Sequence, residues 1–136
     1  MRALTVKQPW AAAIAHGPKR IENRGRRAPA AHVGTTILIH AGLAVDKHAM
    51  LPMGGSDWPR HFGAIIALAD LAGCHQDNDC CRPWGQRKTW HWELANARPV
   101  PHPILGVRGM LGLWTVPDEV LAAVQRQVYT PERTTT

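Results

Sequence analysis

The apolar residues of this chain lie in short segments that proline, glycine and polar residues separate. Segments such as Thr35–Ala41 and Trp90–Leu94 have the length and composition of β-strands. Residues 9–17 instead have the spacing of a short helix that Pro9 begins and Gly17 ends. About six short strands with two or three helices predict a small mixed β-barrel of the α+β class.

Length and composition are typical of a single globular domain. The chain has 136 residues, of which 45% are hydrophobic, enough to bury a core. We expect one domain over residues 1–129 and a frayed tail over residues 130–136. No apolar run approaches the roughly 20 residues of a membrane-spanning helix, and residues 1–10 lack the pattern of a signal peptide. We therefore expect a cytoplasmic protein with no membrane partner.

Other stretches predict individual elements. Residues 20–24 are expected to form a strand with Ile21 pointing inward and Glu22 and Arg24 on the opposite face. The remaining expectations are a strand at 3–6, a helix at 44–51, a buried strand or helix at 63–71, a polar loop at 73–88, a long bent strand at 105–116 and a helix at 117–128.

The positive charge is concentrated in the first half of the chain. The net charge is +6, and residues 1–68 hold nine basic and three acidic residues, whereas residues 69–136 hold seven of each. Five of the basic residues lie within Lys19–Arg27, where Glu22 is the one acid. Such a cluster attracts phosphate groups, although a solvated basic loop that only aids solubility has the same composition.

The basic cluster contains an ordered motif. Residues 17–24 read Gly-Pro-Lys-Arg-Ile-Glu-Asn-Arg and match the pattern G-x-K-x-x-E-x-R at its four defined positions: Gly17, Lys19, Glu22 and Arg24. This pattern is the signature of the ASCH domain family, which the chain resembles over roughly residues 3–116. The surrounding segments, from Lys-Gln-Pro-Trp-Ala at 7–11 to His-Trp-Glu-Leu at 91–94, occur in the family's order.

The resemblance implies a PUA-like β-barrel with a cleft in which the motif faces solvent. Because the family is generally considered to bind nucleic acid, the resemblance implies that the partner is RNA or another single-stranded nucleic acid, or a nucleoside or nucleotide. We expect no cofactor. Some small members are amidohydrolases of acylated pyrimidine nucleosides, and ribonuclease activity has been proposed for others. An enzyme that uses Lys19 and Glu22 is therefore the alternative. Those amidohydrolases carry threonine at the position of Glu22, and Glu93 is the only candidate here for their distal glutamate.

The motif combines one carboxylate with two cations. Glu22, between Lys19 and Arg24, is expected to stay ionised and to accept hydrogen bonds. Arg24 can donate two parallel hydrogen bonds to a phosphate or to a base edge. The same three side chains could instead form only a salt-bridge network that stabilises the barrel. A catalytic lysine would need a lowered pKa, which burial favours and Glu22 opposes.

Residues that flank the motif complete the predicted binding site. We expect Arg20, Arg26 and Arg27 to contact backbone phosphates, so that affinity falls with salt. Trp10 is expected to form a wall of the cleft, because bases stack on indole rings.

The other tryptophans divide by their position. Trp92 and Trp114 follow strand patterns and are expected in the core. Trp58 and Trp84 lie in predicted loops and are weaker candidates for ligand contact. An exposed apolar patch around these two residues would instead indicate a protein-interaction module.

The cysteines raise the question of a metal site. Cys74 precedes His75, and Cys80 and Cys81 follow after two aspartates, but adjacent cysteines are poor partners in a tetrahedral zinc site and no second ligand pair follows. We therefore predict no metal site and free thiols in a loop. His40, at the end of its strand, is interpreted as a structural histidine.

Overall fold

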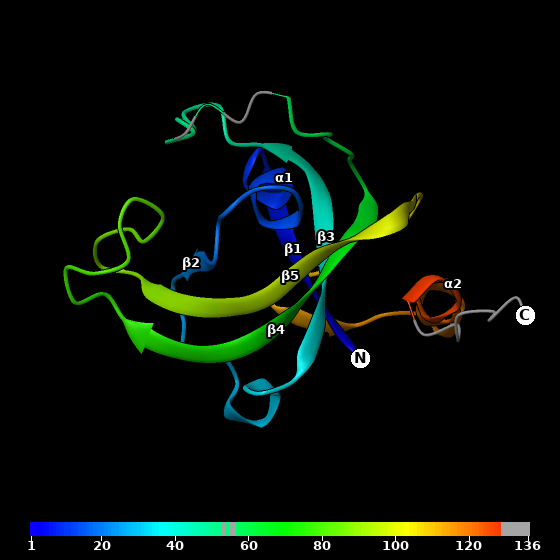
Figure 1. Cartoon of the computed structure of the whole chain (residues 1–136). Helices are drawn as coiled ribbons and strands as arrows, with labels where there is room; N and C mark the ends of the chain where they lie inside the picture. Colours follow the sequence, from blue (N-terminus) through cyan, green and yellow to red (C-terminus); the bar gives the residue numbers. More distant parts are fainter. Residues whose placement is uncertain (53, 55–56, 129–136) are drawn as a thin grey trace, which may run out of the picture.

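Figure 1 shows the computed structural model of the chain, which describes residues 1–52, 54 and 57–128. Its strands form one sheet of six in the order β2-β5-β4-β3-β1-β6. These strands are β1 (Arg2–Gln8), β2 (Ile21–Arg24), β3 (Thr36–Val45), β4 (Ala64–Gln76), β5 (Trp90–Ile104) and β6 (Leu113–Thr115). The helices are α1 (Trp10–Ala15), the 3-10 helix η1 (Ala30–His32) and α2 (Asp118–Val128). The predicted α+β class is confirmed.

The sheet curls into a half-barrel around α1. The long strands β4 and β5 form most of the curve, and α2 lies outside it (Figure 1). β1 and β3 are parallel, whereas the other neighbouring strands are antiparallel. Shifts of register interrupt the β4–β5 pairing, and such irregularities increase the local bend and twist of strands. Among the described residues, no helix has the length and hydropathy to cross a membrane.

The central strands are buried on both faces. Ile37 and Ile39 of β3 pack in the cluster that contains α1, whereas Leu38 packs in the cluster that contains α2. Burial of both faces explains why this segment is apolar at consecutive positions instead of alternating. Burial on both faces also accounts for the apolar segment 63–71, predicted as a buried strand or helix. Residues 64–71 of it form the first part of β4.

Two predicted elements are wrong. Residues 44–51 form no helix, because β3 continues to Val45, which pairs with Gln8 of β1. The long strand expected at 105–116 is reduced to Leu113–Thr115, because Gly106 and Gly112 have positive φ angles of 67° and 65° that interrupt an extended chain.

Smaller corrections concern β2 and the loop after β4. Glu22 is buried and Ile21 is only half-buried, so the side chain that points inward is Glu22. The predicted loop at 73–88 begins later, because β4 extends to Gln76. The predicted C-terminal helix is confirmed as α2, and the predicted tail at 130–136 lies outside the described residues.

Candidate functional site

Lys19, Glu22 and Arg24 contact one another where the chain enters β2. The Lys19 ammonium lies 3.7 Å from Glu22 Oε1, and Arg24 Nη2 donates to Glu22 Oε2 at 2.8 Å. Arg24 Nη2 also donates to the carbonyl of Thr5 at 2.7 Å, and Lys19 donates to the carbonyl of Ile21. The ionic network considered from the sequence is therefore present, and it links β2 to β1.

Two of these side chains are deeply buried. Lys19 is 2% exposed and Glu22 is 7% exposed, whereas the Arg24 side chain is 28% exposed. Burial lowers the pKa of Lys19, and the opposing effect of Glu22 on that pKa is smaller. The Nε atom of Arg24 is buried and has no hydrogen-bond acceptor among the described residues.

The ionic network borders a pocket of about 530 Å³. Trp10 and Trp84 form another part of the lining, with their rings edge to face at 6.4 Å between centroids. The Lys19 ammonium lies 5.7 Å from the Trp10 centroid and 5.9 Å from the Trp84 centroid, within the range of cation–π attraction. The indole of Trp10 donates to Asp46 Oδ2 at 2.9 Å, which fixes the ring. Both charges and aromatic surface thus line one pocket.

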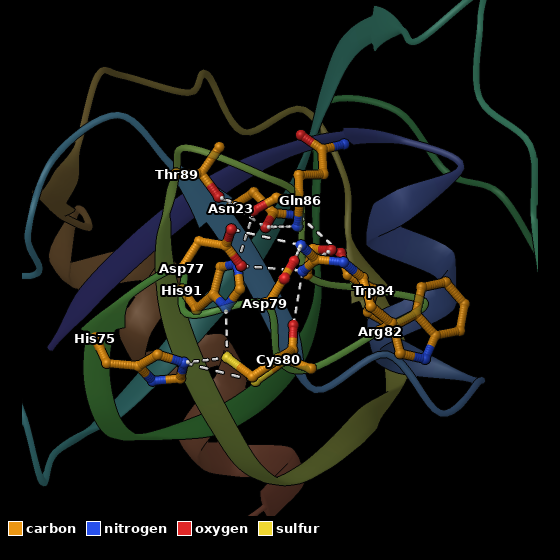
Figure 2. Close-up of polar contacts among 12 residues, drawn as sticks. Asn23, His75, Asp77, Asp79, Cys80, Arg82, Trp84, Gln86, Thr89 and His91 are labelled. Carbon is orange, nitrogen blue, oxygen red and sulfur yellow. Dashed lines mark hydrogen bonds and ion pairs between the residues drawn. The ribbon is translucent and has the colours of Figure 1, made fainter.

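Asn23 connects β2 to the β4–β5 loop (residues 77–89), which carries Trp84. Its amide nitrogen donates to the carbonyl of Trp84 at 2.9 Å. Its amide oxygen accepts from the backbone of Gln86 at 2.8 Å and from the hydroxyl of Thr89 at 3.1 Å (Figure 2). Sequence reasoning missed this residue, because Asn23 occupies an undefined position of the motif and its partners lie more than 60 residues away.

The three arginines expected to contact phosphates lie outside the pocket lining. Arg20 donates through Nη1 to the carbonyls of Ile14, Gly17 and Lys19. It thus provides a hydrogen-bond donor for carbonyl groups in the last turn of α1 and just after it. Arg26 and Arg27 are exposed, and the Arg27 guanidinium lies 5.1 Å from the centroid of the Trp90 ring. The predicted contact of these three arginines with phosphates remains a prediction. It would apply to a nucleic acid that extends beyond the pocket.

The tryptophans follow the expected division only in part. Trp92 and Trp114 are buried, as predicted. Trp58 and Trp84 are half-buried, so they do not form the exposed patch that a protein-interaction module would show. A Cβ atom on Gly17 would lie 2.4 Å from the Trp58 ring, so a larger residue at this position would require that ring to move.

His40 is held in a buried hydrogen-bond chain. Its Nε2 lies 2.7 Å from the carbonyl of Val107, so Nε2 carries the proton and donates it. Its Nδ1 then accepts from the hydroxyl of Thr5 at 3.1 Å, and that hydroxyl accepts from the indole of Trp114 at 3.1 Å. This arrangement requires neutral imidazole, and burial lowers the pKa of His40.

We expect this chain to make stability depend on pH. Because the pKa of His40 is lower in the folded protein than the usual 6.5, the stabilisation is complete above pH 6.5 and is lost as the pH falls below it. His40→Gln lacks this titrating group, so the fall in stability between neutral and acid pH should be smaller in the variant than in the wild type. Urea unfolding at a series of pH values measures the difference. His102→Gln, at an exposed side chain, should leave the pH dependence unchanged, and identical curves for wild type and His40→Gln would contradict the expectation.

A second group of polar side chains lies on the β4–β5 loop and the strands beside it. His75, Cys80, Cys81 and His91, here named the thiol–imidazole cluster, converge so that one ligand atom from each lies within 4.8 Å of the others. Figure 2 shows Trp84 on the opposite side of the loop from His75 and Cys80. Glu93 binds His75 Nδ1 at 3.0 Å and is not part of the pocket lining, so the structure does not bring it to Lys19.

Comparisons with known proteins agree with this fold. A family model described as ASCH domain matches residues 4–103. The crystal structure of ASCH from Zymomonas mobilis has a TM-score of 0.55 and 18% identity, covering 89% of this chain and 90% of that chain. A tyrosine-to-phenylalanine mutant of that protein gives a TM-score of 0.57 and 18% identity, with 90% and 94% covered. The search of curated proteins found no significant match. At these identities the structural likeness shows the fold alone.

Proposed function

The chain belongs to the ASCH domain family, and from this premise we propose that its pocket binds one nucleotide unit of RNA or of another single-stranded nucleic acid. The family is linked to RNA binding in general. The observation that carries the proposal is the placement of Lys19, Glu22 and Arg24 beside two indole rings in one pocket.

The chemistry of the lining suits a nucleotide. Arg24 offers guanidinium donors for a phosphate or a base edge, and the Glu22 carboxylate can accept from a base amino group or a ribose hydroxyl. Trp84 and Trp10 provide aromatic surface, and stacking of a base on such a ring contributes about 1–3 kcal/mol. A volume of about 530 Å³ falls within the range of small-molecule sites.

Replacing Arg24 tests this proposal. Arg24→Gln keeps a donor but removes the charge, and we expect the affinity for RNA to fall about tenfold, the loss of one charged contact. Fluorescence anisotropy with a labelled single-stranded RNA of mixed sequence measures the affinity at several salt concentrations. Unlabelled mononucleotides added as competitors separate recognition of a single nucleotide from recognition of a strand.

The matched control is Arg126→Gln, which changes the net charge equally but lies on α2, outside the half-barrel. It should leave affinity nearly unchanged. The midpoint of urea unfolding for each variant reports whether the protein is folded under the assay conditions. A folded Arg24→Gln protein that binds RNA as tightly as wild type would contradict the proposal, as would equal losses in both variants.

A second candidate function, hydrolysis of acylated pyrimidine nucleosides, has one observation in its favour. Burial lowers the pKa of Lys19, which is the direction that a lysine base requires. Incubation with acylated cytidines, followed by measurement of released acid, tests this function. Turnover that Lys19→Met abolishes would favour the enzyme, and no turnover would leave the binding function as the better account. Incubation with labelled RNA tests ribonuclease activity in the same way.

A further inference from the structure

The thiol–imidazole cluster brings together two sulfurs and two imidazole nitrogens at the spacing of a tetrahedral metal site. His75 Nε2 lies 3.3 Å from Cys80 Sγ and 3.5 Å from Cys81 Sγ. His91 Nδ1 lies 3.8 Å from Cys80 Sγ, and the two sulfurs are 3.2 Å apart. Ligands around a tetrahedral zinc ion, with ordinary Zn–S and Zn–N bond lengths, lie about 3.3–3.8 Å from one another. The cluster is therefore close to the geometry that one ion needs.

The other nitrogen of each imidazole already has a partner. His75 Nδ1 binds Glu93 Oε2 at 3.0 Å, and His91 Nε2 binds the carbonyl of Gln86 at 2.9 Å. The carbonyl of Gln86 accepts a hydrogen bond from the protonated Nε2 of His91, which leaves Nδ1 with a free electron pair on the side of Cys80 Sγ. Histidines that bind metals usually donate their second N–H to a carboxylate or carbonyl in this way. Both rings are thus oriented as ligands.

The fold explains how residues that are distant or adjacent in sequence can share one centre. His75 and His91 face each other across the β4–β5 ladder, where they are paired in register. Cys81 has a positive φ angle of 66°, a conformation uncommon for residues other than glycine, and it turns the Cys81 side chain toward that of Cys80. Gly85 lies against the cluster, since a Cβ atom there would be 2.6 Å from His91 Cε1.

We propose that the thiol–imidazole cluster binds one structural Zn²⁺ ion. Thiolate and imidazole ligands together suit zinc, and four protein ligands form a closed site of the structural kind. On binding, each of the two thiols gives up its proton to solvent, so the two thiolates balance the charge of the ion. The His75 side chain is 35% exposed and offers a route of entry. This inference replaces the prediction of free thiols, which considered only the spacing of the cysteines.

The site would stabilise the loop that forms one wall of the pocket. The β4–β5 loop supplies Cys80 and Cys81 to the cluster and Trp84 to the pocket lining. Cys80 and Trp84 lie on different sides of this loop (Figure 2). Zinc would fix one side of the loop, and Asn23 fixes the other. The proposal itself does not depend on what the pocket binds.

Metal analysis of the purified full chain tests the site. The protein is produced in zinc-supplemented medium, purified without chelators, dialysed, and analysed by inductively coupled plasma mass spectrometry. We expect about one zinc per chain. Cys80→Ser and Cys81→Ser should each reduce the content to below about a tenth of that value. Cys74→Ser should retain it, because the Cys74 sulfur instead accepts from the backbone of Ala28 at 3.3 Å.

A cobalt titration keeps the test independent of how well the variants fold. Wild-type protein stripped of metal under reducing conditions and given Co²⁺ should show the thiolate charge-transfer band and the strong visible bands of a tetrahedral site, and zinc should abolish both. Glu93→Gln weakens the orientation of His75 and should lower zinc affinity about 10–100-fold while leaving one ion bound at saturation.

Three results would overturn the proposal. The first is wild-type protein that contains no zinc and gives no tetrahedral cobalt spectrum. The second is zinc content that falls as much in Cys74→Ser as in Cys80→Ser. The third is a disulfide between Cys80 and Cys81 in freshly purified protein, detected as a mass loss of about two hydrogens that a reductant reverses.

Discussion

Replacing Glu22 with glutamine is expected to lower the free energy of unfolding by about 3–5 kcal/mol. Glu22 is 7% exposed and provides the carboxylate for Lys19, which is 2% exposed. The amide of glutamine has nearly the shape of the carboxylate but no charge, so the variant leaves a buried ammonium without its anion. Urea unfolding followed by tryptophan fluorescence measures the loss.

A second substitution shows whether the charge is responsible. Lys19→Met in the Glu22→Gln background removes the uncompensated cation, and the double variant should recover part of the lost stability. Glu119→Gln on the exposed face of α2 is the matched control and should change stability by less than about 1 kcal/mol. A loss below that value for Glu22→Gln would mean that Lys19 is neutral in the folded protein, which is the direction in which burial moves its pKa.

Sequence patterns predicted the elements whose signals are local. α1 lies between Pro9 and Gly17, and α2 begins with two acidic residues that suit its positive end. The motif itself is local as well, since Glu22 and Arg24 are two residues apart in a strand and therefore share a face. Such signals hold because they depend on neighbours in the chain.

Elements that depend on distant pairing were mispredicted. Residues 44 and 45 look helical in isolation but extend β3, because Gln8 of the parallel strand β1 pairs with Val45. The apolar residues of 105–112 suggest a strand, yet Val107 donates to the carbonyl of Gly63 and accepts from His40 Nε2, between two glycines with positive φ angles. None of these contacts leaves a periodic pattern in the sequence.

The residues of the candidate sites show the same difference between local signals and distant pairing. Lys19 and Trp10 could be placed together because only a few residues separate them, whereas Trp84 reaches the same pocket through the β4–β5 loop. The thiol–imidazole cluster was missed because its two histidines meet only through the register of β4 with β5. The pairing of Gln76 with Trp90 places His75 opposite His91.

Trp92 is a buried residue that helps to position the motif. It is 4% exposed, faces Glu22 across the β2–β5 ladder, and donates through its indole to the carbonyl of Arg26 at 2.9 Å. β2 has four residues and lies at the edge of the sheet, with β5 as its neighbour. Trp92 thus contacts the strand that carries Glu22 and Arg24 in two ways: as the ladder partner of Glu22 and by a hydrogen bond just beyond the end of β2.

Trp92→Ala is therefore expected to lower the free energy of unfolding by about 3–5 kcal/mol, the cost of a large cavity in the core. Trp92→Phe keeps most of the packing but removes the indole donor, so its loss should be smaller, about 1–3 kcal/mol. Trp90→Ala, at a half-buried position of the same strand, provides the comparison and should also cost less. The midpoints of urea unfolding at unchanged slope give the order of the three variants. A Trp92→Ala variant that is no less stable than Trp90→Ala would contradict this expectation. The motif strand would then be held chiefly by the hydrogen bond from Arg24 to Thr5 and by the ionic network. In that case Arg24→Gln would be the more destabilising change.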